Sequence, residues 1–225
     1  MELKGRRSKK ILRELLGADD INASIETICL YPARQSVNFL FSFFYDKDEI
    51  IKWRAIAAFG RVVSMLADEN MESARVIMRR LMWNLNDESG GIGWGSPEAM
   101  GEITALHPGL AKEFSNMLKS YIRPEENFLE HELLQRGVLW GIGRLAQARP
   151  ECLPQTDGFL FPFLASADAY HRGLSAWALG NLKSRASVNA LEQLAEDKNE
   201  ILFFNDLVLK PLTVGFLATE AIGKR

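Results

Sequence analysis

The chain has 225 residues, of which 47% are hydrophobic and 25% are charged, with a formal net charge of -2 at pH 7. This composition excludes bulk disorder, because a chain of this kind can bury a sizeable core. It also lacks the basic excess with which general nucleic-acid binders displace counterions, so we do not expect DNA or RNA as the partner.

The N-terminal part is predicted to be helical. Apolar residues with helical spacing define five segments, which are 7–16, 20–31, 33–45, 49–67 and 70–86. Asp19 or Asp20 is expected to cap the second of these helices, and Pro32 to start the third.

A glycine-rich loop is predicted to follow, from Asn86 to Ser96. The next helix has the usual signals of a helix start, with Ser96 as N-cap, Pro97 at the first helical position and Glu98 in the first turn. Pro108 then opens a further helix over about 108–122.

The C-terminal part is predicted to contain more helices and one hairpin. Helices are expected over 128–148, 168–182 and 185–197, with irregular or short helical structure over 150–166. Two apolar runs flank Asn205-Asp206 and predict a short β-hairpin with a two-residue turn, which would cover the end of the helical array. Thr213 is expected to cap the last helix.

A pattern of small and apolar residues that runs into a glycine occurs five times. Its glycines are Gly60, Gly101, Gly143, Gly180 and Gly223, which are 41, 42, 37 and 43 residues apart. Helical-pair repeats have periods near these values, and a small-residue face lets stacked helices approach closely. The sequence therefore predicts an all-α fold, an α-α superhelix of about five helix pairs, as a single domain over 1–225.

Two of these segments carry a family resemblance. Ala176 to Gly180 and Glu98 to Ile103 resemble the second helix of HEAT-like repeats of the PBS-lyase type. The resemblance implies the solenoid fold but no single function, since such repeats serve scaffolds and enzymes alike. It leaves open a tetrapyrrole or other small-molecule function, as in bilin attachment, and a role similar to that of HEAT-like alkylpurine DNA glycosylases.

Acidic residues and a histidine form one group of candidate site residues. Glu98 and Glu102 lie four residues apart on one helix face, where they are either a solvated surface pair or a site that binds a metal or performs acid–base chemistry. His131 and Glu132 form a single His-Glu pair, whereas the HEAT-like deoxyhypusine hydroxylase uses several such pairs for iron. We therefore expect no metal site and no cofactor, although stacked repeats would bring Glu98, Glu102 and His131 to one pocket.

Aromatic and basic residues recur at repeat positions. Trp140 and Trp177 each precede a repeat glycine by three residues, which indicates either packing between repeats or an aromatic groove. Arg136 and Arg144 belong to a row of arginines that either pair with acids of the next repeat or form a positive strip. Trp94 lies in the glycine-rich segment from Gly90 to Gly101, which is either an inter-repeat loop or an anion-binding cradle.

The leading interpretation is a non-catalytic interaction module that binds a protein or peptide on its concave face. The sequence has no strong catalytic motif and no transmembrane run, and Cys29 and Cys152 are too isolated for a disulfide scaffold, which fits a cytoplasmic protein without membrane contact. The expected binding residues are Trp94, Glu98, Glu102, His131, Glu132, Arg136, Trp140, Arg144 and Trp177.

Overall fold

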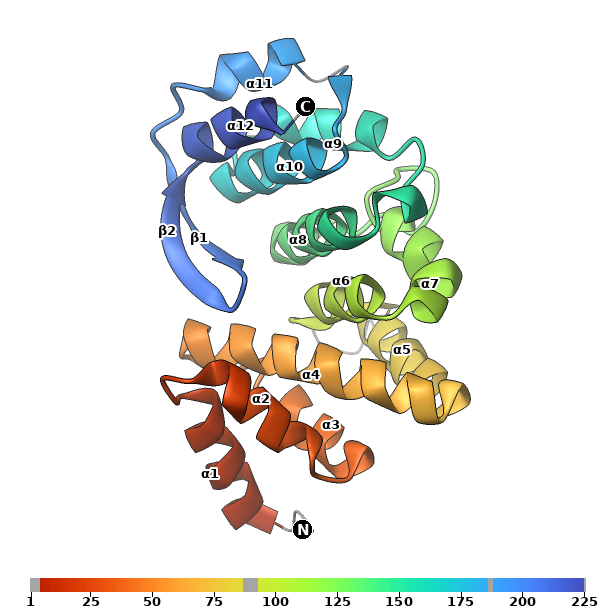
Figure 1. Ribbon diagram of the computed structural model, residues 1–225. Coiled ribbons are helices and arrows are strands. Elements are labelled where there is room, and N and C mark those ends of the chain that lie inside the picture. Colours follow the sequence, from red (N-terminus) through yellow and green to blue (C-terminus); the bar gives the residue numbers. More distant parts are fainter. Residues whose placement is uncertain (1–4, 87–92, 186–187, 225) are drawn as a thin grey trace.

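The structure is a computed structural model that describes residues 5–86, 93–185 and 188–224 as a curved array of helices with one β-hairpin (Figure 1). The first half contains α1 (Gly5–Leu16), α2 (Ile21–Cys29), α3 (Ala33–Phe41), α4 (Glu49–Glu69), α5 (Met71–Asn86) and α6 (Ser96–Leu106). The second half contains α7 (Pro108–Ser120), α8 (Glu132–Ala148), the 3-10 turn η1 (Pro150–Cys152), α9 (Asp157–Leu164), α10 (Ala169–Asn181), α11 (Val188–Leu194), β1 (Glu200–Asn205), β2 (Val208–Thr213) and α12 (Val214–Gly223).

The helices stack in two layers. Helices α4, α6, α8, α10 and α12 form an inner row, and α3, α5, α7, α9 and α11 pack behind them as an outer row (Figure 1). Each inner helix carries one of the five repeat glycines, at positions 60, 101, 143, 180 and 223. The predicted superhelix of five helix pairs is therefore confirmed, with α1 and α2 added at its N-terminal end.

Glycines let the inner helices approach closely. A Cβ built on Gly101 would overlap the Gly141 backbone, and one built on Gly141 would lie 2.8 Å from the carbonyl oxygen of Pro97. One built on Gly143 would overlap the indole ring of Trp177. The repeat glycines Gly101 and Gly143 thus have a packing cause, because no side chain fits between the helices there, whereas a Cβ on Gly223 at the end of the array would meet nothing within 4 Å.

The predicted hairpin is present, but its turn and its position differ from the prediction. Asn205 pairs with Val208, so the turn residues are Asp206 and Leu207, one position later than predicted. Both have positive φ, 49° and 62°, as a type I′ turn requires. The hairpin does not cap the end of the array but lies along the inner row (Figure 1).

Aromatic contacts explain where the hairpin lies. The Phe204 ring stacks on Trp53 of α4, with ring centroids 5.1 Å apart, and the Phe204 carbonyl accepts a hydrogen bond from Trp140 Nε1 at 2.8 Å. Phe203 meets Trp177 edge to face at 5.0 Å. The three inner tryptophans are buried beneath the hairpin, which keeps their rings from water.

Two of the predicted helix caps are confirmed and one is wrong. Asp20 caps α2 and Thr213 caps α12, each by accepting a backbone N–H with its side chain. Ser96 is not the N-cap of α6; it is the first helical residue, and Gly95 precedes it with φ of 78°. A Cβ on Gly95 would lie 2.8 Å from the Phe44 ring, so only glycine fits at this entry to the helix.

Some helix ends also differ from the prediction. Helix α3 ends at Phe41 rather than at 45. Ser42 is its C-cap residue, and the Ser42 hydroxyl donates a hydrogen bond to the Phe39 carbonyl oxygen at 2.7 Å. Helix α8 begins at Glu132 rather than at 128, because the His131 ring accepts the N–H of Leu133 and starts the helix there. Of the predicted glycine-rich loop, residues 87–92 lie outside the described part of the chain.

Among the residues that the structure describes, no helix combines the length and the apolar character that crossing a bilayer requires.

The contact between α6 and α8 can be tested with one substitution. Gly101→Ala is expected to lower the free energy of unfolding by about 1–3 kcal/mol, because its methyl group overlaps backbone that cannot rotate away. Urea denaturation monitored by circular dichroism would measure the change.

The matched control is Gly158→Ala in α9, where an added Cβ meets nothing within 4 Å. It is expected to leave stability unchanged or to raise it by up to about 1 kcal/mol. Equal stability of the two variants would contradict the close-approach explanation.

Candidate functional site

Two cavities open on the inner row, one on each side of the hairpin. The first, here called the aromatic pocket, has a volume of about 480 Å³ and lies at the N-terminal ends of α4, α6, α8 and α10, beside Leu202 of β1. The second, the charged pocket, has a volume of about 470 Å³ and lies between α2, α4, α6, α8 and the hairpin tip. Trp140 lines both, so this side chain forms the wall between them.

The aromatic pocket takes its name from six of its lining residues, which are Phe44, Tyr45, Trp53, Trp94, Trp140 and Tyr170. At its rim, Tyr45, Trp94, Leu133 and Leu202 are exposed to 47%, 39%, 45% and 43%. These four are gathered around one opening, whereas single exposed apolar residues are ordinary on protein surfaces. Such a cluster is typical of an interaction site.

Glu98 is a buried acid in the wall of this pocket. Its side chain is only 7% exposed, and the carboxylate lies so close to Gly137 that a Cβ there would be 2.6 Å from Oε2. Within the described residues, Oε2 has no hydrogen-bond partner. Burial raises the pKa of the Glu98 carboxyl, while Lys52 opposes and Glu49 adds to that rise. A backbone hydrogen bond to the carboxyl group also opposes the rise, but Oε2 is left without a donor, which costs stability.

The other charged groups around the aromatic pocket are mostly in ion pairs. Lys52 Nζ lies 3.3 Å from Glu49, and Arg136 Nε lies 2.6 Å from Asp168. Asp46 is paired with Arg13 across 3.2 Å. Lys47 lines the pocket as an exposed cation. Among the described residues that line this pocket, Glu98 is the one acid that is buried.

Two of these cations already lie over aromatic rings of the pocket. Lys52 Nζ is 5.8 Å from the centroid of Trp53, and Arg136 Cζ is 4.4 Å from the centroid of Tyr170. The ring faces of this lining therefore attract positive charge.

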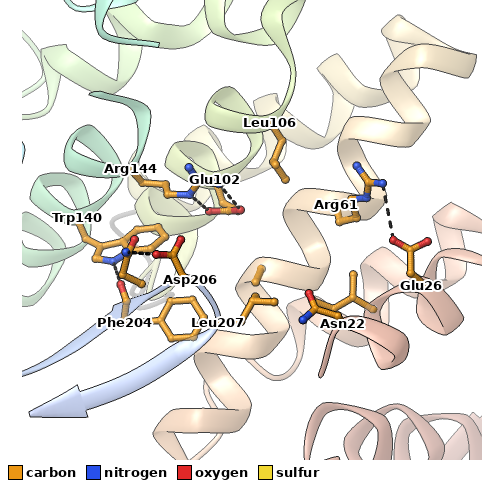
Figure 2. Close-up of a pocket in the computed structure, with 13 residues that line it drawn as sticks. Asn22, Glu26, Arg61, Glu102, Leu106, Trp140, Arg144, Phe204, Asp206 and Leu207 are labelled. Atoms are coloured by element: carbon orange, nitrogen blue, oxygen red, sulfur yellow. Dashed lines mark hydrogen bonds and ion pairs between the residues drawn. The ribbon is translucent and has the colours of Figure 1, made fainter. Parts of the chain in front are cut away.

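The charged pocket is built from ion pairs on opposite sides, as Figure 2 shows. Arg144 binds Glu102 at 2.7 Å, and Arg61 lies 3.8 Å from Glu26. Burial raises the pKa of Glu102, and the Arg144 guanidinium opposes that rise. Arg144 and Arg61 thus pair with acids from neighbouring elements, as the pairing interpretation of the arginine row expects.

Comparisons with known proteins place the fold. No protein-family profile matches the sequence. A designed armadillo repeat protein matches with a TM-score of 0.55 at 16% identity, over 98% of this chain and 94% of that one. A second designed armadillo repeat protein, solved in complex with peptide (KR)4, matches with a TM-score of 0.53 at 15% identity, over 96% of this chain and 98% of that one. The chain has an armadillo/HEAT-like repeat fold.

One relative is similar in sequence as well. An uncharacterized protein of Archaeoglobus fulgidus is 31% identical over 115 residues, which is 51% of this chain and 56% of the relative. The match thus covers only about half of each chain.

Six of the predicted site residues of this HEAT-like repeat protein line the two pockets. Trp94, Glu98 and Arg136 line the aromatic pocket, Glu102 and Arg144 line the charged pocket, and Trp140 lines both. The prediction that Glu98 and Glu102 share a helix is confirmed, yet they face different cavities. Both are buried, so neither belongs to a solvated surface pair.

The other three predicted residues lie elsewhere. His131 is exposed and caps α8, and Glu132 is exposed in the first turn of that helix. Trp177 is buried between Gly143 and Phe203, where it packs the repeats together. Glu98, Glu102 and His131 therefore do not line one pocket, because capping directs His131 to the start of α8. In the part of the chain that the structure describes, no cluster of three metal-ligating side chains occurs.

Sequence reasoning missed most of the aromatic pocket. Tyr45 precedes α4, Tyr170 belongs to α10 and Leu202 to β1, and no local pattern links these residues. One signal was present in the repeat itself. Glu98 precedes Gly101 by three residues, the same offset at which Trp140 and Trp177 precede their glycines. The first and last repeats have Ala57 and Glu220 at this offset, so the signal is that Glu98 lies in the same row as Trp140 and Trp177.

The unsatisfied carboxyl group of Glu98 can be tested by its effect on stability. Its raised pKa means that the folded state binds the proton more tightly than the unfolded state does, so the wild type loses stability as pH rises through that pKa. Glu98→Gln carries no such proton. It is expected to gain about 1–3 kcal/mol relative to the wild type at mildly alkaline pH, and the gain should vanish in acid.

Thermal and urea denaturation across this pH range would measure the difference. Glu132→Gln removes an exposed carboxylate one helix away and serves as the control, with an expected change within roughly 0.5 kcal/mol. A loss of stability in Glu98→Gln at alkaline pH would show that the carboxylate has a partner after all.

Proposed function

We propose that this protein is a non-catalytic interaction module that binds a protein or peptide partner at the aromatic pocket. The proposal depends on one observation, the exposed apolar rim of Tyr45, Trp94, Leu133 and Leu202 around a concave opening. Rigid aromatic side chains in and around a desolvated pocket are the usual anchors of protein interfaces.

The fold supports this proposal in a general way. Helical repeat arrays offer an extended inner surface, and one designed armadillo repeat protein of this fold is in complex with peptide (KR)4. The charged pocket continues the same surface on the other side of the hairpin, so that a partner could contact both. The free thiols of Cys29 and Cys152 fit a reducing compartment, and we propose the cytoplasm as the place of action.

A small molecule is the second candidate for the same pocket. Its volume of about 480 Å³ is within the usual range of small-molecule sites, and its lining is mainly apolar with a few polar groups. Native mass spectrometry of the protein from its own host separates the two candidates. A stoichiometric small molecule would favour this second one, whereas an added protein mass would favour the interaction module.

Selection from a library of short random peptides tests the interaction directly. Enriched peptides are expected to lose about ten-fold or more in affinity for Trp94→Ala, because the ring is a rim anchor of the pocket. Isothermal titration calorimetry would measure the dissociation constants.

Trp83→Ala is the matched control, since Trp83 is 73% exposed on α5 and lines neither pocket. It is expected to bind the same peptides as the wild type. If no peptides are enriched, or if both tryptophan variants lose affinity equally, the proposed site is wrong.

A further inference from the structure

We propose that the aromatic pocket binds a cationic side chain, lysine or arginine, of the partner, with the Glu98 carboxylate as its counter-charge and the surrounding rings as its walls. This inference rests on the proposed function, because it names the chemistry of the partner at the same site. It starts from Glu98 Oε2, which lacks a hydrogen-bond partner in the described residues although it is buried.

A buried carboxylate oxygen without a donor is rare in folded proteins, since its desolvation is not compensated. The protein has a cation close by, Lys52, but its ammonium group is engaged by Glu49 at 3.3 Å. Arg136, on the facing helix α8, is engaged by Asp168. Because both inner cations have other partners, neither is free to satisfy Glu98, and we infer that a ligand supplies the donor.

The rings of the pocket suit a cation better than a neutral donor. Trp53 and Tyr170 already face Lys52 and Arg136, which shows that the lining tolerates positive charge over its aromatic faces. Trp94 stands at the opening, 39% exposed, with its ring centroid 6.2 Å from that of Tyr45. A long aliphatic side chain that enters past this rim would bury its methylene groups against the rings and bring its charged end to Glu98.

The position of Glu98 is fixed by its neighbours. Its carboxylate lies against Gly137 of α8, where a side chain would occupy the same space. Asp46, Lys47 and Glu49 are exposed or partly exposed near the opening. Asp46 and Lys47 would therefore act on the approach of a ligand, whereas the charge of Glu49, which already acts on Glu98, would also favour a bound cation.

Fluorescence anisotropy with a labelled peptide of alternating glycine and lysine tests the inference. An otherwise identical peptide with acetylated lysines removes the charge while it keeps the length. The lysine peptide is expected to bind at least about ten-fold more tightly than the acetylated one. Glu98→Gln is expected to remove this preference, and Gly137→Ala to weaken it, because the added methyl group displaces the carboxylate.

Glu132→Gln provides the matched control. It changes the net charge by the same amount as Glu98→Gln but removes an exposed carboxylate outside both pockets. It is expected to bind the lysine peptide as the wild type does. An equal loss in both variants, or no loss in Glu98→Gln, would overturn the inference and show attraction by net charge alone.

Two further outcomes separate this inference from the proposed function. If the peptides selected from the random library depend on Trp94 but contain no basic residue, the interaction site stands and the cationic ligand is wrong. Spermidine, titrated in parallel, supplies the same amine chemistry from a small molecule. If spermidine binds the wild type but not Glu98→Gln, and the lysine peptide binds neither, the cation comes from a small molecule. The inference that a partner's side chain supplies it would then be wrong.

Discussion

The close approach of α6 and α8 is the constraint on which the rest of the structure depends. Gly101 and Gly141 bring the two backbones together, and Gly137 leaves the space in which the Glu98 carboxylate lies. Because α6 carries this acid where α8 and α10 carry tryptophan, the rings of Trp53 and Trp140 meet across it with centroids 4.8 Å apart. The close contact between α6 and α8 therefore accounts both for the stacking of the repeats and for the wall of the aromatic pocket.

Electrostatics on the inner surface follow from this packing. Helices that approach closely leave little room for water, so each buried charge needs a partner from a neighbouring element. Arg144 meets Glu102, Arg136 meets Asp168, and Arg172 meets Asp197 at 2.7 Å. Glu98 departs from this pattern, because its Oε2 has no partner in the described residues. The aromatic pocket therefore has an unpaired buried acid, whereas the buried acid of the charged pocket, Glu102, is paired with Arg144.

The repeat and the site differ in how far the sequence predicts them. The five glycines predicted the inner row because close packing leaves a local, periodic trace, and Asp20 and Thr213 were recognisable as caps for the same reason. The path of the hairpin depends on contacts of Phe204 with helices far away in sequence, which no local pattern encodes. His131 shows the opposite case: it was expected to bind a partner together with Glu132, but its ring accepts the Leu133 N–H and completes the first turn of a helix outside both pockets.

The contact of Phe204 with Trp53 also bears on how the protein folds. In an open repeat array each unit touches only its neighbours, so the ends can unravel one unit at a time. Here the hairpin ties the C-terminal repeats to α4 near the other end, so β1 cannot leave the inner row without breaking this aromatic contact. Because this contact joins residues far apart in the sequence, we expect it to couple the unfolding of the C-terminal repeats to that of α4 and to slow folding.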